Sequence, residues 1–67
     1  MAIVKVIEVI SESSVSWEDA AQNAVKEAAK TIKNIKSVYI KEFKAAVDGN
    51  EITKYLVIAK ISFGVEN

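Results

Sequence analysis

The sequence predicts an α+β fold with the element order β-α-β-β, in which one helix packs against a small antiparallel sheet. Residues 3–10 are rich in β-branched side chains, which favour strands. Residues 17–35 carry an apolar stripe at helical spacing. Two further strand-like runs flank Asp48-Gly49-Asn50, a hairpin-turn signal because these residues tolerate positive φ.

The first expected strand covers residues 3–10. Lys5 and Glu8 fall on opposite faces of this strand, so neither face is purely polar. Residues 11–14, with the sequence Ser-Glu-Ser-Ser, are expected to end it. Serine side chains compete for backbone hydrogen bonds and favour turns and helix caps, so a break is predicted here.

The helix is expected to run over residues 17–35. Ser16 is the best N-cap candidate, with Asp19 three residues on, and Val15 is expected to pack against Ala20. Apolar side chains recur at steps of three and four: Trp17, Ala20, Ala21, Ala24, Val25, Ala28, Ala29, Ile32 and Ile35. This stripe is narrow and mostly alanine, so the helix is expected to approach its sheet closely.

The last two strands are expected over residues 37–47 and 51–65. A two-residue period places one apolar set of the last strand toward the helix: Tyr55, Val57, Ala59, Ile61 and Phe63. Leu56 and Ile58 lie on the other face. The charged Lys54 and Lys60 limit how far the apolar surface of that face extends. One helix covers only one face of a sheet, so another subunit is expected to cover the second face.

The composition indicates a single domain over residues 1–67 that is marginal as an isolated unit, because such chains bury only about 60% of their unfolded surface. The chain has no Cys and no His, which excludes disulfides, thiol nucleophiles, zinc sites and imidazole acid–base chemistry. Oligomerisation is the remaining means of stabilisation, unless a hard cation binds carboxylates.

The charge pattern argues against nucleic acid or a membrane as partner. Nine Lys balance nine Asp and Glu, with no basic block and no Arg, the residue preferred for phosphate and base contacts. No apolar run approaches the roughly 20 residues of a membrane span, and Lys5 and Glu8 interrupt any signal-peptide pattern. The sequence therefore predicts a soluble, cytoplasmic protein.

Six segments, in order and spacing, resemble the dodecin family over nearly the whole chain. They are Lys5-Val-Ile-Glu-Val9, Ser13-Ser-Val-Ser-Trp-Glu-Asp-Ala-Ala21, Ala24-Val25 with Ala28, Thr31-Ile-Lys-Asn-Ile35, Val38-Tyr-Ile-Lys-Glu42, and Tyr55 with Lys60-Ile-Ser-Phe63. The resemblance implies a three-stranded antiparallel sheet wrapped around one helix. It also implies a hollow homododecamer of tetrahedral symmetry, and a protein that binds its ligand without catalysis.

Many dodecins bind flavins, such as FMN or riboflavin, in pairs near subunit interfaces and store or sequester them. The resemblance implies two contact positions: a Trp that stacks on the flavin ring and a Gln that hydrogen-bonds the ring edge. Ser37 holds the Trp position and Leu56 holds the Gln position, so flavin affinity is expected to be weak or lost. Tyr39 lies on the same strand face as Ser37. It is expected to fill a subunit interface, and a substitute aromatic surface for a ligand is the alternative.

The family also contains calcium-associated members. Five carboxylates are candidates for Ca²⁺ or Mg²⁺, although no calcium-loop spacing is present: Glu8, Glu12, Glu42, Asp48 and Glu51. A single carboxylate near a threefold axis becomes a ring of three in a symmetric shell. The sequence does not choose among these residues, and ordinary solvated surface charge is the favoured interpretation of them.

Two functions remain open: a small-ligand binding shell with a pocket at Ser37, Tyr39 and Leu56, and a structural or calcium-binding shell. Catalysis is not expected, because the serines near Trp17 have no histidine base and no nucleophile elbow. Trp17 itself is interpreted as a hydrophobic anchor at the helix start.

Overall fold

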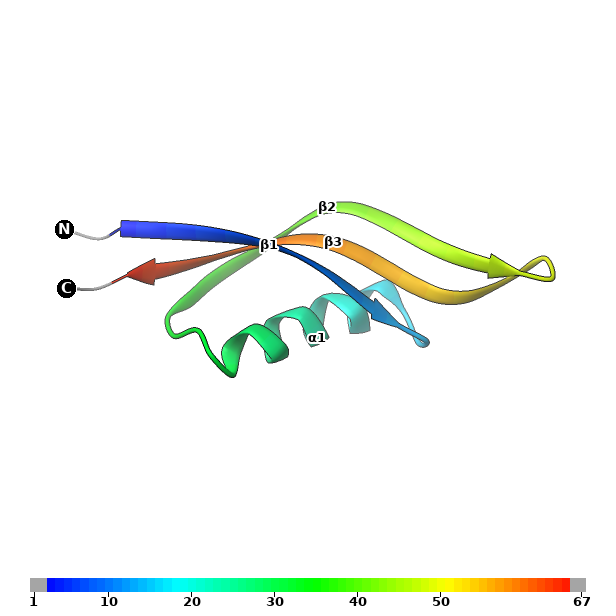
Figure 1. Ribbon diagram of the computed structural model, residues 1–67, viewed down its shortest axis with the longest axis horizontal. Coiled ribbons are helices and arrows are strands. Elements are labelled where there is room, and N and C mark those ends of the chain that lie inside the picture. Colours follow the sequence, from blue (N-terminus) through cyan, green and yellow to red (C-terminus); the bar gives the residue numbers. More distant parts are fainter. Residues whose placement is uncertain (1–2, 66–67) are drawn as a thin grey trace.

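A computed structural model describes residues 3–65, which form three strands and one helix. The elements are β1 (Ile3–Ser13), α1 (Trp17–Ala29), β2 (Ile35–Asp48) and β3 (Glu51–Val65). The strands form one antiparallel sheet in the order β1-β3-β2, and α1 lies against one of its faces (Figure 1). The predicted β-α-β-β fold is confirmed. Within residues 3–65, no helix has both the length and the apolar character needed to cross a membrane.

Strand β1 continues three residues beyond its predicted end at Ile10. Ser11 to Ser13 pair with Val57 to Tyr55 of β3, so the ladder bonds to the central strand override the turn preference of serine. The predicted break is therefore wrong for residues 11–13 and comes only at Ser14. Ser13 is buried, and its hydroxyl donates to Asp19 Oδ2 at 2.6 Å while accepting the Val15 N–H at 2.9 Å. Ser13 therefore ties the end of β1 to the first turn of the helix.

Helix α1 begins as predicted. Ser16 has extended backbone angles, and its side chain accepts the Asp19 N–H at 3.0 Å, so it is the N-cap. The expected packing of Val15 against Ala20 does not bury Val15, which stays 70% exposed although Ala20 is fully buried.

The helix ends at Ala29, six residues before the predicted end at Ile35. The N–H groups of Lys30 and Thr31 bond to carbonyls three residues back, which tightens the last turn. Asn34 then adopts a positive φ of 63°, and its carbonyl accepts the Gly64 N–H at 2.9 Å. The chain is thereby turned into β2, and Ile35 pairs in the sheet instead of extending the helical stripe.

The hairpin between β2 and β3 forms at the predicted turn. Gly49 and Asn50 have φ values of 59° and 68°, the pair of positive angles that a two-residue type I′ turn requires. The boundaries of β3 match the prediction, whereas β2 begins two residues earlier than expected and continues to Asp48. Three register shifts interrupt the pairing of β2 with β3.

The core lies between α1 and the face of β3 that the alternation pattern assigned to the helix. Val57, Ala59 and Ile61 of β3 have no exposed surface, and Val57 and Ala59 pack with Ala20 of the helix. Ala24 of the helix is buried as well. That part of the prediction is confirmed. Ala29, predicted to belong to the buried stripe, is exposed because the helix ends there.

Trp17 anchors the start of α1 to the distal half of the β2–β3 hairpin. Its ring meets Tyr55 edge-on at 4.9 Å and Phe43 at 6.1 Å between centroids, and its indole N–H donates to the Lys44 carbonyl at 2.8 Å. The interpretation of Trp17 as a packing anchor is consistent with these contacts, all of which lie away from Ser37.

The second face of the sheet is covered by no element among residues 3–65. Leu56 and Ile58, on the central strand, are half-buried by their neighbours. The exposed apolar side chains of this face come mainly from the flanking strands: Val4, Val6, Ile10 and Tyr39. We call this surface the open sheet face.

Candidate functional site

Ser37 and Tyr39 lie side by side along β2 on the open sheet face. Ser37 pairs with Ser62 of β3, and the two hydroxyl groups are within hydrogen-bonding distance of each other. Tyr39 pairs with Lys60, and 63% of its surface is exposed. This end of the face therefore offers two hydroxyls, one aromatic surface and one ammonium group.

Glu8 of β1 flanks the same cluster, because Lys60 pairs with Glu8 on one side and with Tyr39 on the other. The Glu8 carboxylate also lies 3.7 Å from the Lys41 ammonium. Both partners are about half exposed, so solvent screens the pair and its contribution to stability is small. The cluster is thus polar and hydrated in the isolated subunit.

Leu56 shares the open sheet face but lies far from Ser37. It pairs with Glu12 of β1 and Lys44 of β2, whereas Ser37 pairs with Ser62, six residues further along β3. Six residues of extended strand span about 20 Å. One subunit therefore does not bring Leu56 together with Ser37 and Tyr39, and a small ligand that touches all three positions must lie between subunits.

The candidate metal ligands are also dispersed within one subunit. Glu8, Glu12 and Glu42 lie on the open sheet face, by their pairing with Lys60, Leu56 and Ile58. The remaining two candidates, Asp48 and Glu51, pair with each other at the hairpin. Within residues 3–65 no three acidic side chains come close enough together to hold a metal ion. A site built from three of these carboxylates would therefore need more than one subunit.

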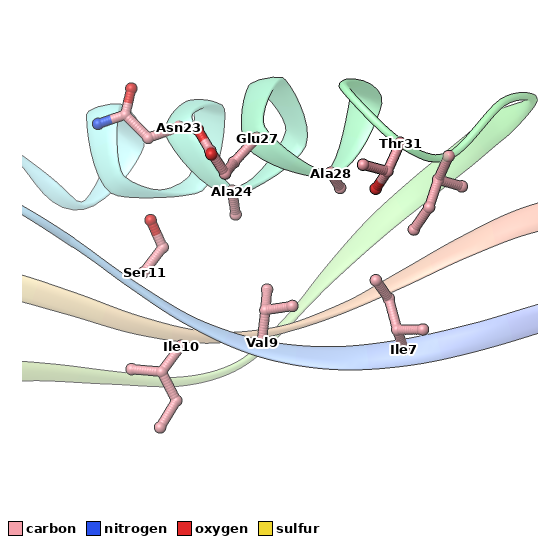
Figure 2. A pocket seen from close by; sticks show the side chains of 10 residues that line it. Ile7, Val9, Ile10, Ser11, Asn23, Ala24, Glu27, Ala28 and Thr31 are labelled. Atoms are coloured by element: carbon pink, nitrogen blue, oxygen red, sulfur yellow. The ribbon is translucent and has the colours of Figure 1, made fainter.

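A pocket of about 330 Å³ lies between α1 and β1, away from all three predicted site residues. Ile7 and Val9 point toward the helix, Ala24 and Ala28 face them from α1, and Thr31 lies in the turn that follows α1 (Figure 2). We call this hollow the α1–β1 pocket. Sequence reasoning missed it, although the small residues of the helix stripe were the signal: alanines at these positions leave space beside an edge strand. The pocket is mostly apolar and opens to solvent in the isolated chain.

Comparison with known proteins identifies the family. The family model for dodecin matches residues 3–66. The calcium dodecin of Mycobacterium tuberculosis is 35% identical over 63 residues, which cover 94% of this chain and 89% of that protein. A crystal structure of the M. tuberculosis calcium dodecin, described as having a novel calcium-binding site, superposes with a TM-score of 0.82 at 34% identity, covering 96% of this chain and 91% of the other.

More distant dodecins share the same fold. A Thermus thermophilus dodecin variant has a TM-score of 0.95 at 24% identity, with all of both chains covered. The Streptomyces coelicolor dodecin has a TM-score of 0.94 at 21% identity, covering 98% of this chain and 94% of the other. The family match over nearly the whole chain, together with the 35% identical relative, shows that this chain belongs to the dodecin family.

Proposed function

We propose that this chain is the subunit of a closed shell of twelve copies that binds a small ligand or ion between subunits and catalyses no reaction. The shape of the subunit supports assembly. Its radius of gyration is 13.7 Å and its extents are 52 × 19 × 13 Å. A compact domain of this length would have a radius near 11 Å. The excess reflects long strands whose apolar side chains have no partner within the subunit.

The proposed small-ligand site lies on the open sheet face, where one subunit supplies Ser37, Tyr39 and Lys60 and a neighbour supplies Leu56. The separation of Leu56 from Ser37 along β3 carries this proposal, because only an interface unites the positions. Tyr39 offers an aromatic surface, the serine hydroxyls offer donors and acceptors, and Lys60 favours an anionic group on the ligand.

Flavin is expected to bind weakly at this site. A stacking aromatic typically contributes about 0.5–1.5 kcal/mol beyond the area it buries, and Ser37 provides no ring. A lost hydrogen bond to a ligand group left unpaired costs about 1–3 kcal/mol, and Leu56 has no polar atom to supply it. Since each 1.4 kcal/mol is tenfold in affinity, the two replacements together weaken flavin binding by orders of magnitude.

A riboflavin fluorescence titration of the assembled protein tests the site. We expect weak quenching for the wild type and strong, saturable quenching for the double variant Ser37→Trp/Leu56→Gln. Ser14→Trp is the matched control, because it adds the same ring at an exposed position outside the sheet face. If the double variant assembles normally but quenches no better than the control, the assignment of the pocket is wrong.

A cation is the second candidate ligand. The similarity to a protein named calcium dodecin at 35% identity favours it, as do the three carboxylates on the open sheet face. Glu8 and Glu12 are each in an ion pair, with Lys41 and Lys54, whereas Glu42 makes no ion pair within residues 3–65. Glu42 is therefore the first residue to test as a member of a ring around a symmetry axis.

Thermal unfolding with calcium or with a chelator tests this candidate. A cation that binds only the folded assembly raises the melting temperature, and chelation reverses that shift. We expect Glu42→Gln to abolish the calcium-dependent part of the shift and Glu18→Gln, an exposed helix position, to preserve it. Identical melting curves with calcium and with chelator would remove the cation from the account. The cytoplasmic location expected from the sequence stays a prediction.

A further inference from the structure

The tip of the β2–β3 hairpin contains an aspartate followed directly by a glycine, Asp48-Gly49. The chain has one other aspartate, Asp19, which precedes Ala20 in the first turn of α1. A peptide nitrogen can attack the side-chain carboxyl carbon of the aspartate before it, because the five-membered ring that forms has little strain. Glycine makes this attack easiest, since it has no Cβ to block the approach. The tip is therefore the place in this chain where such a reaction is expected.

Both reacting groups are available at the tip. Asp48 is exposed, and its carboxylate makes no hydrogen bond or ion pair among residues 3–65. The Gly49 N–H makes no hydrogen bond in that part of the chain either. A Cβ added at Gly49 would meet nothing within 4 Å, so the space around this residue is open. Within the subunit, no neighbouring group has to be displaced before the ring closes.

The other aspartate is held in the opposite situation. The Asp19 carboxylate accepts the Ser13 hydroxyl at 2.6 Å and the side-chain amide of Asn23 at 3.2 Å. The nitrogen that would have to attack it, that of Ala20, donates to the Ser16 carbonyl at 3.1 Å and belongs to a fully buried residue. Ring closure at Asp19 would break this hydrogen-bonded first turn of the helix. The chain therefore carries its own internal control for a reaction at Asp48.

The tip is also weakly tied to the rest of the sheet. Asp48 and Glu51 form the last pair of β2 with β3, and only the pair Val47–Ile52 separates them from the register shift that follows Ala46. Val47 is 65% exposed and Ile52 50%, and the tip extends beyond the end of α1, so few contacts hold these two pairs closed (Figure 1). The end of a ladder with few buried contacts opens at low free-energy cost while the rest of the protein stays folded. Asp48 can therefore leave its extended conformation, as ring closure requires, without global unfolding.

We propose that Asp48 is a site of spontaneous conversion to isoaspartate in the folded protein. In the first step the Gly49 nitrogen bonds to Cγ of Asp48, and the carboxyl hydroxyl leaves with the proton of that nitrogen as one molecule of water. In the second step water adds to the imide ring. Breaking the bond from nitrogen to Cγ restores aspartate, whereas breaking the bond from nitrogen to the main-chain carbonyl carbon gives isoaspartate. Water is the only co-reactant, so the proposal requires no enzyme, ligand or ion.

The product changes the turn at its first residue. Isoaspartate places one additional carbon in the main chain between Asp48 Cα and Gly49, so the connection no longer has the spacing of a two-residue type I′ turn. The pair Asp48–Glu51 is therefore expected to be lost. The register shift after Ala46 is expected to confine the change to the tip, because pairing beyond it does not depend on the last two pairs. The modified protein should keep its fold and carry an altered hairpin end.

Peptide mapping of stored protein tests the site. Purified wild-type protein is held at neutral pH and body temperature for several weeks and then cleaved after its lysines, which isolates residues 45–54 with Asp48 and residues 6–26 with Asp19. We expect a second form of peptide 45–54 that has unchanged mass and co-elutes with a synthetic isoaspartyl standard, and no such form of peptide 6–26. Storage in heavy-oxygen water should add heavy oxygen to the converted form, because ring hydrolysis takes its oxygen from water. Deamidation of Asn50 is distinguished because it changes the mass in ordinary water.

Two substitutions at the same position are the matched variants. Asp48→Glu keeps the charge but would have to close a six-membered ring, which forms far more slowly, so no conversion is expected. Asp48→Asn is expected to convert several-fold faster than wild type, because a neutral carboxamide is attacked more readily than an ionised carboxylate. No isoaspartate at Asp48, or as much at Asp19 as at Asp48, would overturn the proposal.

A destabilised variant separates reaction at the folded tip from reaction in the unfolded chain. Ser16→Ala removes the helix N-cap, which lies outside the hairpin, and is expected to raise the unfolded fraction about fivefold. If the folded tip reacts, the rate of conversion at Asp48 is the same in Ser16→Ala as in wild type. A rate that rises in proportion to the unfolded fraction would assign the reaction to the unfolded chain and overturn the role of the tip.

Discussion

The indole N–H of Trp17 donates to the carbonyl oxygen of Lys44 at 2.8 Å, across 27 positions of sequence. This bond joins the first residue of α1 to β2, at the start of the part of the β2–β3 hairpin that extends beyond the helix. The ring of Trp17 adds edge-on contacts to Tyr55 and Phe43 on both strands of the hairpin. Trp17 therefore sets the position of the β2–β3 hairpin relative to the helix.

Replacing Trp17 with Phe tests this anchor. The substitution removes the hydrogen bond and part of the ring contact, so the free energy of unfolding is expected to fall by about 1–2 kcal/mol. Urea unfolding at one fixed protein concentration measures the change, because assembly makes apparent stability depend on concentration. Lys26→Gln, at an exposed position of the helix, is the control and is expected to stay near wild type. Equal stability of Trp17→Phe and wild type would show that the anchor contributes nothing.

The N-cap gives a second prediction. Ser16→Ala removes the acceptor of the Asp19 N–H and is expected to lower the free energy of unfolding by about 1 kcal/mol. Ser16→Thr keeps an acceptor oxygen and should retain most of that stability. Ser14→Ala is the matched control, because Ser14 is exposed and lies outside the helix. A loss as large in the control as in Ser16→Ala would argue against a specific cap.

The two glycines of the chain give a contrast in backbone freedom. Gly49 has a φ of 59°, where a side chain is strained although the space around it is open, so Gly49→Ala is expected to cost about 1 kcal/mol. Gly64 has no positive φ, and an added Cβ would lie 3.3 Å from Cε of Lys36, a flexible side chain that can move. The same unfolding measurement should therefore show a smaller loss for Gly64→Ala, and the reverse order would contradict the turn geometry.

The sequence predicted the elements well and their ends less well. The hairpin turn followed from Gly49 and Asn50 because their backbone preference is local. The end of α1 did not follow, because Ile32 and Ile35 continue the helical spacing even though Asn34 turns the chain into β2. The end of β1 was missed for a related reason: pairing with β3 stabilises the strand through Ser13, and a pairing register is not visible in local composition.

The candidate site shows the same limit. The shared face of Ser37 and Tyr39 follows from strand alternation and agrees with their pairing to Ser62 and Lys60. The distance of Leu56 from them depends on the register of β2 against β3, which includes three shifts. The location of the α1–β1 pocket depends on how α1 packs over the edge strand β1. The alanines of the helix indicate that there is room beside the helix, but not where that room lies.

The open sheet face is tested by Ile58→Glu. Ile58 lies in the middle of this face, between Ile10 and Glu42, and a carboxylate there would be buried in any interface that covers the face. We expect loss of the assembled form in size-exclusion chromatography and destabilisation of the subunit. Thr53→Glu, at an exposed bulge of the same strand, is expected to assemble. An intact shell with Ile58→Glu would mean that the wrong face was assigned, and a stable folded monomer would mean that assembly is not obligatory.

The mass of the purified wild-type protein in solution tests the central claim most directly. Sedimentation equilibrium at micromolar concentration should give a single closed species about twelve times the 7.3 kDa of one chain. Such a result would account for the extended subunit, for its open sheet face, and for the exposed side chains of Phe43, Val47 and Ile52 on the β2–β3 hairpin. A folded monomer that persists at 7.3 kDa across the concentration range would contradict the account, because the exposed apolar surfaces would then be stable in water without a partner.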